Sequence, residues 1–429
     1  MKIIKYTDND FDNQIKKLTY RTAFSENVEN IVSEMLKKIK KEGDKALSFY
    51  ANKLDNVSLI TEEFKLSSKE IEDAEKSLSA ETKRAIETAN ENVSLFAKQR
   101  IPKSWKFSPR KGVILGERYQ PYDRIACYIP GGTAPLVSTV IHTASIAKTA
   151  GVKEIVVTTP CKPDKSVHPA ILYAAKVAGA TEVYRLGGVF GIGALAYGTN
   201  TISKVDKIVG PGNQYVTAAK RHVYGEVALD MVAGPSEILV IADDTANPAS
   251  VAADLLSQAE HGSGKEQAIF VSNSFSLIKK VEKELNSQIK TRKKADYLNK
   301  VYEKGIFLIF TKDISQAIDV ANNYAPEHLE IMTENSKDDA KQIKAAGAIF
   351  IGHYTPECVG DFTAGPSHVL PTGGSATRFS GLTVEQFFRR MSTVEYSKEA
   401  LKKELPAIRE FAINEQLDAH GYSAEVRIT

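Results

Sequence analysis

From about Gly112 onward, the chain alternates short β-branched runs with segments of helical character. The runs are RIACYI, KEIVVTT, TEVYRL and KIVG, followed by SEILVIA, QAIFVS, GIFLIFT and GAIFIG. Such alternation is typical of βαβ units, whose strands form parallel sheets. The loop signal Gly234-Pro235 lies between the two groups of four runs. We therefore expect an α/β protein with two Rossmann-like parallel-sheet domains.

The first hundred residues have a helical pattern. Ser79 is a suitable N-cap for a segment in which Ile86, Ala89, Val93 and Phe96 recur at the spacing of one helix face. This pattern predicts a helical N-terminal region.

The strand patterns stop after Gly374. Helices are expected around Val384 to Met391 and Lys398 to Asn414. This tail has a thin apolar stripe and would bury little area alone, so we expect it to pack on the rest of the chain or on a second subunit. The expected regions are 1–110 (helical), 111–235 (first α/β domain), 236–375 (second α/β domain) and 376–429 (helical tail).

The composition excludes several classes of protein. The 56 Lys and Arg are interspersed with 53 Asp and Glu, so a nucleic-acid partner is not expected. No apolar stretch approaches the roughly 20 residues that span a membrane, and the N-terminus lacks the apolar segment of a signal peptide. Three cysteines without CxxC spacing argue against a disulfide framework. We expect a cytoplasmic protein with a small-molecule substrate.

Several polar residues have the chemistry of metal ligands. Gln258 and His261 in LLSQAEHGSG are three residues apart, so on a helix they share a face and could hold one ion; alternatively, His261 could cap the helix end. Asp361 and His368 lie in the loop CVGDFTAGPSHVLPTGGSA, whose glycines and prolines favour a functional loop. His420, in LDAHGYS, is a further candidate. Such nitrogen and oxygen donors suit zinc and tolerate manganese or cobalt.

An acid and an imidazole are adjacent in NNYAPEHLE. Pro326 suits the first turn of a helix or a tight turn, which would display Glu327 and His328 just after a loop. The imidazole can exchange a proton with an alcohol and the carboxylate can activate water. A Glu-His dipeptide also occurs by chance, so the pair alone does not establish catalysis.

Glycine-rich segments in the first α/β domain could approach a nucleotide. GIGALA loosely matches the pattern that admits a pyrophosphate at a helix N-terminus. YIPGG, from Tyr128 to Gly132, and GPGN, from Gly210 to Asn213, have the composition of strand-to-helix turns at the carboxyl ends of strands. Tight-turn geometry alone would also explain these glycines.

Taken in order, the motifs YIPGGTAPL, VDKIVGPGN, DMVAGPSE, LLSQAEHG, YAPEHLE, GDFTAGPSHVLPT and LDAH cover nearly the whole chain. This ordered set resembles the histidinol dehydrogenase family. The resemblance implies a four-electron oxidation of L-histidinol to L-histidine through the aldehyde, with two NAD molecules reduced in turn and one zinc ion per subunit. It also implies an intertwined homodimer, in which we expect the tail of one subunit to complete the active site of the other.

The resemblance assigns roles to individual residues. The implied catalytic pair is Glu327 and His328, and the implied zinc ligands are Gln258, His261, Asp361 and His420. Substrate contacts are implied for Ser236, His368 and Glu415 together with the four ligands and His328. Cofactor contacts are implied for Tyr128, Asn213 and the position of Phe190.

At that last position the chain departs from the family pattern. Phe190 stands where the family usually has a Gln, and a ring cannot replace an amide's hydrogen bonds, so contact with NAD there would be apolar, stacked or absent. Phe190 could also fill the core. Two alternatives remain open: a related zinc and NAD dehydrogenase of another small polar alcohol, such as a sulfopropanediol, and a zinc-dependent binding protein or hydrolase without redox chemistry. Retention of His368 and Glu415 favours histidinol, since a carboxylate would repel an anionic sulfonate.

Overall fold

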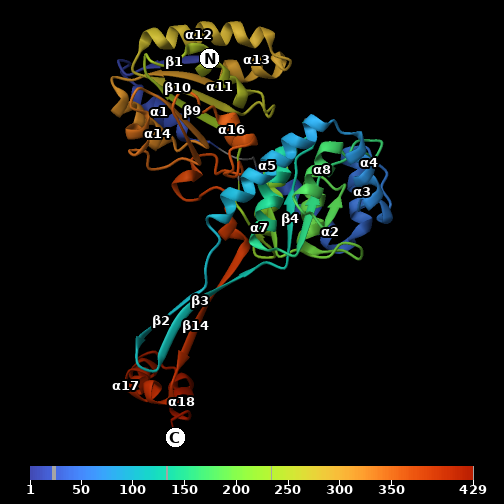
Figure 1. Cartoon of the computed structure of the whole chain (residues 1–429), viewed down its shortest axis with the longest axis vertical. Coiled ribbons are helices and arrows are strands. Elements are labelled where there is room, and N and C mark those ends of the chain that lie inside the picture. Colours follow the sequence, from blue (N-terminus) through green and yellow to red (C-terminus); the bar gives the residue numbers. More distant parts are fainter. Residues whose placement is uncertain (22–25, 132–133, 233, 429) are drawn as a thin grey trace.

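The computed structural model describes residues 1–21, 26–131, 134–232 and 234–428. They form two α/β bodies and an arm that projects from one of them (Figure 1). The N-terminus lies in the upper body of this view, whereas the C-terminus lies at the tip of the arm. Among the described residues, none of the helices combines the length and the apolar character that crossing a bilayer requires.

The first parallel sheet has the strand order β6-β5-β4-β7-β8. Its strands are β4 (Arg124–Tyr128), β5 (Glu154–Thr158), β6 (Glu182–Tyr184), β7 (Lys207–Val209) and β8 (Ala228–Leu229). One face is covered by α5 (Ala80–Lys98), α6 (Val137–Val140), a π-helical turn (Ile141–Ser145), α7 (Ile146–Ala150) and α8 (Pro169–Val177), with α4 (Ser68–Ser77) packed outside α8. The other face is covered by α2 (Glu26–Glu42), α3 (Asp44–Asp55), α9 (Gly188–Tyr197) and α10 (Gln214–Val223). Buried residues therefore alternate between the two faces along each strand.

The second parallel sheet has the order β1-β11-β10-β9-β12-β13. Its strands are β1 (Lys2–Lys5), β9 (Glu237–Ala242), β10 (Gln267–Ser272), β11 (Ile306–Phe310), β12 (His328–Met332) and β13 (Ala348–Ile351). Helices α11 (Pro248–Ala259), α12 (Phe275–Gln288) and α13 (Ala295–Lys304) cover one face, and α1 (Phe11–Thr19) and α14 (Ile314–Tyr324) cover the other. Short helices α15 (Ser336–Ala340) and α16 (Glu357–Phe362) follow β12 and β13. The two groups of strands expected from the sequence are confirmed.

The N-terminal region is largely helical, as expected, and Ser79 caps α5 by accepting a hydrogen bond from the backbone of Thr82. The two ends of this region are strands, although helices were expected throughout. Residues 2–5 form β1, which pairs in parallel with β11, and the region ends in a further strand, β2 (Trp105–Arg110). A strand as short as β1 has too little pattern of its own, and its pairing with a distant strand determines its conformation.

The arm is built on an antiparallel sheet of β2, β3 (Val113–Pro121) and β14 (Phe388–Tyr396), and it ends in α17 (Lys398–Asn414) and α18 (Asp418–Glu425). The prediction of a helix from Val384 to Met391 is wrong. A 3₁₀ turn (Val384–Phe387) leads directly into β14, which pairs with β3 over its whole length. This long-range pairing outweighs the local helical preference. The helix predicted from Lys398 to Asn414 is confirmed.

The turn after β7 depends on a glycine. Gly210 has a φ of +113°, and a Cβ there would overlap the carbonyl oxygen of Tyr128 at the end of β4. Its N–H donates to Asp230 Oδ2 at 2.7 Å. The residue thus holds the GPGN turn against the neighbouring strand.

We expect Gly210→Ala to lower the thermal unfolding midpoint by about 3–8 °C, because it combines positive-φ strain with a steric clash. Circular dichroism would measure the shift. Gly225→Ala is the matched control, since Gly225 also has a positive φ, of +97°, but no atom lies within 4 Å of the added Cβ. An equal shift in both variants would contradict the importance of the close approach.

Candidate active site

The Glu327-His328 pair lies at the amino end of the second sheet. His328 is the first residue of β12, and Pro326 and Glu327 precede this strand, so of the two contexts proposed for Pro326 the helix start is not observed. The side-chain Oε2 of Glu327 accepts the backbone N–H of Glu237 at 2.9 Å, and His328 Nδ1 lies 3.1 Å from the Glu237 carbonyl oxygen. A carbonyl can only accept, so Nδ1 carries a proton, and Nε2 is the nitrogen that can gain or lose the second one.

His328 Nε2 faces the carboxylate of Asp361. His328 Nε2 lies 3.6 Å from Asp361 Oδ1, which is also 3.8 Å from His368 Nδ1. Asp361 belongs to α16, and His368 lies in the loop that follows it. His368 Nδ1 is within 3.1 Å of the Asp361 carbonyl oxygen, so the loop folds back on the helix. One carboxylate therefore lies between two imidazoles.

The end of α11 adds two further candidates. Gln258 is fully buried, whereas His261 lies just beyond the helix and is exposed. The charges of Asp361 and His328 contribute to the pKa of His261, so His261 lies in the same region of the structure. Gln258 Oε1 and His328 Nε2 are buried polar atoms without a hydrogen-bond partner among the described residues. Buried polar atoms are rarely left unpaired, so two such atoms in one site indicate that a ligand belongs there.

The pKa shifts in the site distinguish Glu327 and His328 from Asp361. Burial raises the pKa of Glu327 to about 8, although His328 opposes the rise. Burial would lower the pKa of His328, but Glu327 and Asp361 outweigh it and raise that pKa above its ordinary value. For Asp361, burial favours a higher pKa, yet His328 and His368 hold it below its ordinary value. Glu327 and His328 thus favour holding a proton, while Asp361 stays charged.

The site lies at the junction of the two α/β bodies. His368 Nε2 is 3.1 Å from the Thr139 hydroxyl on α6, and its ring stacks on that of His142 at a centroid separation of 4.4 Å. The His142 carbonyl accepts a hydrogen bond from Ser367. Elements of the first body therefore fix the loop that carries His368. Ser236, directly before β9, is half-buried at the edge of the same region.

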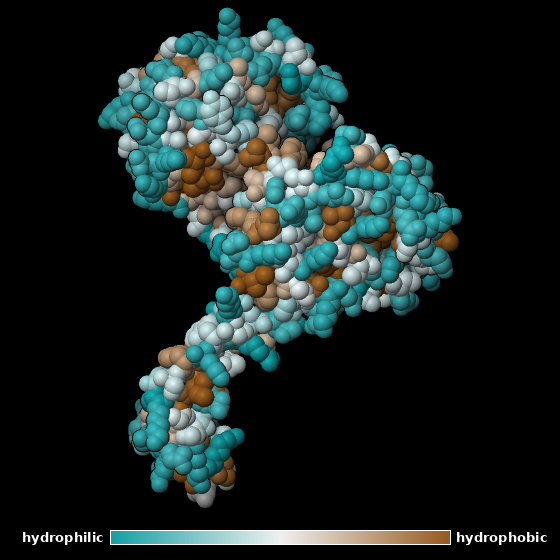
Figure 2. All heavy atoms as spheres, in the orientation of Figure 1, coloured by the Kyte–Doolittle hydropathy of each residue, from teal (hydrophilic) through white to brown (hydrophobic). Residues whose placement is uncertain are grey.

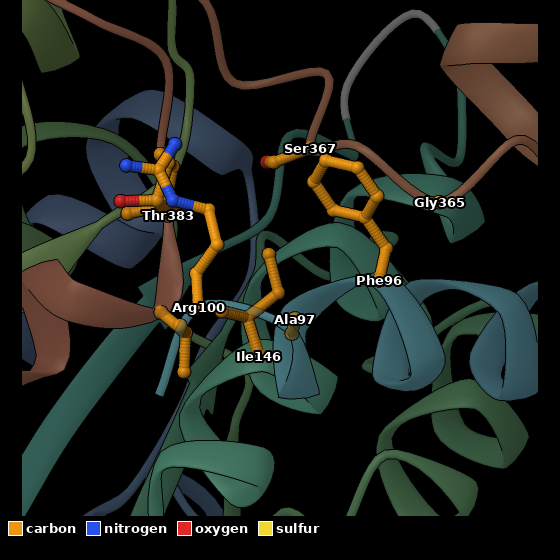
Figure 3. Close-up of a pocket in the computed structure, with 9 residues that line it drawn as sticks. Phe96, Ala97, Arg100, Ile146, Gly365, Ser367 and Thr383 are labelled. Carbon is orange, nitrogen blue, oxygen red and sulfur yellow. The ribbon is translucent and has the colours of Figure 1, made fainter. Parts of the chain in front are cut away.

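The same loop presses against α5. Figure 3 shows Phe96 of α5 beside Gly365 and Ser367, with Arg100 and Thr383 across the pocket between them. This pocket has a volume of about 10 Å³, which is enough for one water molecule and too small for a substrate. It is therefore not the substrate site.

Two predicted site residues lie far from this cluster. Glu415 follows α17 and His420 lies in α18, at the tip of the arm and remote from α11 and α16 (Figure 1). Both residues are exposed. Within one chain, the structure brings together Gln258, His261, Glu327, His328, Asp361 and His368, but not the two residues of the tail.

Two of the three residues implied for the cofactor, Tyr128 and Asn213, lie at the carboxyl edge of the first sheet. Tyr128 ends β4 and its hydroxyl accepts the backbone N–H of Gly188, while Asn213 is the N-cap of α10. Phe190 is 1% exposed and packs in the core, which corresponds to the core-filling alternative. The GIGALA glycines lie within α9, where a Cβ on Gly193 would crowd Ile39, so they serve helix packing. Gly132, the last residue of YIPGG, lies outside the described residues.

Sequence reasoning missed two acids that organise the cluster. Glu237 holds both members of the catalytic pair through its backbone, and Glu357 on α16 contacts Gln258. The group His328, Glu357 and Asp361 could itself hold a metal ion by its spacing. The available signal was the four-residue spacing of Glu357 and Asp361, which places both on one helix face.

Comparisons with known proteins agree with this geometry. The family model described as histidinol dehydrogenase matches residues 18–428. The chain is 42% identical to histidinol dehydrogenase of Listeria monocytogenes, over 100% of this chain and 99% of the relative, and 42% identical to histidinol dehydrogenase 2 of Trichormus variabilis, over 93% and 92%.

The structural comparison extends over the full length. The crystal structure of histidinol dehydrogenase from Elizabethkingia anophelis superposes with a TM-score of 0.93 at 37% identity, covering 100% of this chain and 98% of that one. All three relatives are named histidinol dehydrogenase, which favours histidinol over the sulfopropanediol alternative. Because the family consists of oxidoreductases, the alternative of a protein without redox chemistry is excluded. The chain therefore belongs to the histidinol dehydrogenase family of NAD-dependent oxidoreductases.

Proposed function

We propose that this protein oxidises L-histidinol to L-histidine in two successive NAD-dependent steps, with one zinc ion per subunit and an active site shared between two subunits. The observation that carries the proposal is the Glu327-His328 pair, held on the backbone of Glu237 beside nitrogen and oxygen donors that lack partners. Each step removes two electrons as hydride, and water supplies the second carboxylate oxygen.

The donor set fits zinc. Gln258, His261 and Asp361 supply an amide oxygen, an imidazole and an ionised carboxylate, and the partner subunit's His420 would complete the set. The unpaired Gln258 Oε1 supports this assignment, because a cation would satisfy it. Bound zinc would act as a Lewis acid that holds the amine and imidazole nitrogens of the substrate.

His328 is suited to remove the hydroxyl proton as hydride leaves for NAD. Its Nδ1–H is committed to the Glu237 carbonyl, so the basic nitrogen is Nε2. The negative charge of Asp361 raises the pKa of His328. A zinc ion bound to Asp361 would neutralise this charge, so the pKa of His328 would fall towards the range of a general base. Glu327 would activate the water that converts the aldehyde to its hydrate, and His328 would then assist the second hydride step.

Substrate recognition is assigned to residues around this pair. Ser236 and His368 flank the donor set, while the partner subunit's Glu415 would attract the cationic form of histidinol. His368 already exchanges hydrogen bonds with Asp361 and Thr139, so its ring is held in one orientation.

The carboxyl edge of the first sheet is suited to the cofactor. The N-cap of α9 is Gly187, which has no side-chain cap, so backbone N–H groups in the first turn, other than that of Gly188, which donates to Tyr128, are available to a pyrophosphate. Tyr128 and Asn213 lie on the two neighbouring turns. Since Phe190 is buried, we propose that NAD is held here without a side-chain amide at that position.

The arm is suited to pair with a second subunit. Phe411, Ile413 and Tyr422 are 68%, 69% and 66% exposed, and Figure 2 shows apolar side chains on the surface of the arm. Apolar area of this kind on a slender projection is costly in a monomer. Glu415 and His420 lie among these residues, so a dimer that buries this surface would deliver both to the partner's site.

The first prediction concerns reaction stoichiometry and metal. Purified protein should form about two NADH per histidinol, none after chelation, and recover on addition of zinc. His261→Ala and Asp361→Ala should lose zinc, measured by elemental analysis after dialysis. His353→Ala is the matched control, since His353 is outside the cluster and should retain zinc. Absence of NADH with both histidinol and histidinal would rule out the proposed reaction.

The second prediction separates the roles of the pair. His328→Asn should slow both oxidations by about 10²–10⁴-fold while zinc content is unchanged, because the proton acceptor is lost. Glu327→Gln should slow histidinal oxidation more than histidinol oxidation. Stopped-flow NADH formation from each substrate would measure both. A variant of Glu327 that loses zinc would contradict its role in water activation.

The third prediction tests the shared site. His328→Ala and His420→Ala proteins should each be inactive, but subunits mixed after mild denaturation should recover about a quarter of wild-type activity. Half of the dimers are then hybrids, and each hybrid has one intact site. Mixing His328→Ala with His261→Ala is the control, because both changes lie in the same half-site. Full activity of a His420→Ala protein would contradict the shared site.

A further inference from the structure

Glu357 at the start of α16 is held from three sides. It is almost completely buried, at 2% exposure. Its Oε2 accepts a hydrogen bond from the Ser257 hydroxyl at 2.6 Å, and its Oε1 accepts one from the Gln258 side-chain Nε2. Its backbone N–H donates to Glu330 Oε1 at 2.6 Å. The carboxylate therefore has one position relative to the end of α11.

This contact selects one of the two orientations of the Gln258 amide. The Gln258 Nε2 group donates to Glu357 Oε1, so the NH₂ side of the amide faces Glu357 and the carbonyl Oε1 faces away from it. That oxygen is buried and has no hydrogen-bond partner among the described residues. A flipped amide would place two oxygens against each other and turn the NH₂ group, which cannot bind a cation, towards the site.

We infer that Glu357 is a positioning residue that presents the Gln258 carbonyl oxygen to zinc. The inference rests on the proposed function, since it takes Gln258 as a ligand. Glu357 also lies near His328 and Asp361, at a spacing that would allow it to bind a metal directly. Both of its oxygens already accept hydrogen bonds from Ser257 and Gln258, so the geometry favours the positioning role. Carboxylates that orient a metal ligand in this way typically change metal affinity when removed.

The test measures zinc affinity of the full-length, metal-free protein by competition with a chromogenic chelator. Glu357→Gln keeps the size of the side chain but can donate to Gln258, so it permits the flipped amide. Zinc affinity should fall about 10–100-fold. Glu260→Gln is the matched control, because it removes a charge two residues from Gln258 in sequence at an exposed position. Its zinc affinity should equal that of the wild type.

A paired exchange distinguishes positioning from a general structural role. In the Gln258→Glu/Glu357→Gln double variant, the amide at 357 donates to a carboxylate at 258, whose other oxygen is free to bind zinc. The zinc affinity of the double variant should recover to within about threefold of the wild-type affinity. Glu357→Asp, which keeps the charge but withdraws it from Gln258, should bind zinc more weakly than the wild type. Thermal unfolding of the metal-free proteins would show that each variant is folded.

Two results would overturn the inference: wild-type zinc affinity in Glu357→Gln or Glu357→Asp, or a double variant that binds zinc no better than Glu357→Gln. A different result would overturn the proposed zinc site itself. If Gln258→Ala retained wild-type zinc affinity, Gln258 would not be a ligand. If Gln258→Ala lost affinity while Glu357→Gln did not, only the positioning role would fail.

Discussion

The site depends on the main chain of one residue, Glu237. Its N–H donates to Glu327 and its carbonyl oxygen accepts a hydrogen bond from His328, so the two peptide groups at the start of β9 fix both the acid and the base. The Glu237 carboxylate pairs with Arg21 at 2.7 Å and accepts the N–H of Gly373. One buried residue thus connects the N-terminal segment, the catalytic pair and the loop that follows His368. Buried polar groups with this many partners restrict a site to one geometry.

The parallel pairing of β9 with β12 makes this arrangement possible. His328 is paired with Ile238, and a shift of one residue would turn the His328 side chain to the opposite face of the sheet. The register is enforced by the cores on both faces, where Ile238 and Val240 contact one helical layer and Leu239 and Ile241 contact the other. The hydrophobic packing of the second domain therefore determines where the catalytic pair lies, although neither catalytic side chain contributes to that packing.

Much of this fold follows from sequence patterns, and the failures have physical causes. The strands from RIACYI to GAIFIG were predictable because they read as continuous apolar runs, and all of them except β13 are largely buried. The strands β1, β2, β3, β8, β12 and β14 were missed. β1 and β8 are only four and two residues long, and the apolar run of β12 is interrupted by His328 and Glu330. β14 is exposed along most of its length, so its pairing with β3 leaves no apolar alternation. The polar candidates at 258, 261, 327, 328, 361 and 368 were recognised by motif, but Glu237 was not, because it acts through its backbone and any residue type supplies the same peptide groups.

The arm connects this local chemistry to assembly. Helices α17 and α18 pack on each other and on the end of an antiparallel sheet, and their large apolar residues Phe411, Ile413 and Tyr422 remain exposed. A stand-alone module of this size has too small a core to be stable without a partner surface. At the same time, two buried atoms of the donor cluster, Gln258 Oε1 and His328 Nε2, have no hydrogen-bond partner among the residues that the structure describes. A dimer interface that buries Phe411 and Ile413 would stabilise the tail. The same interface would complete the donor cluster of the body if it brought His420 to the site of the neighbouring subunit. Catalysis and dimer stability would then depend on the same contact.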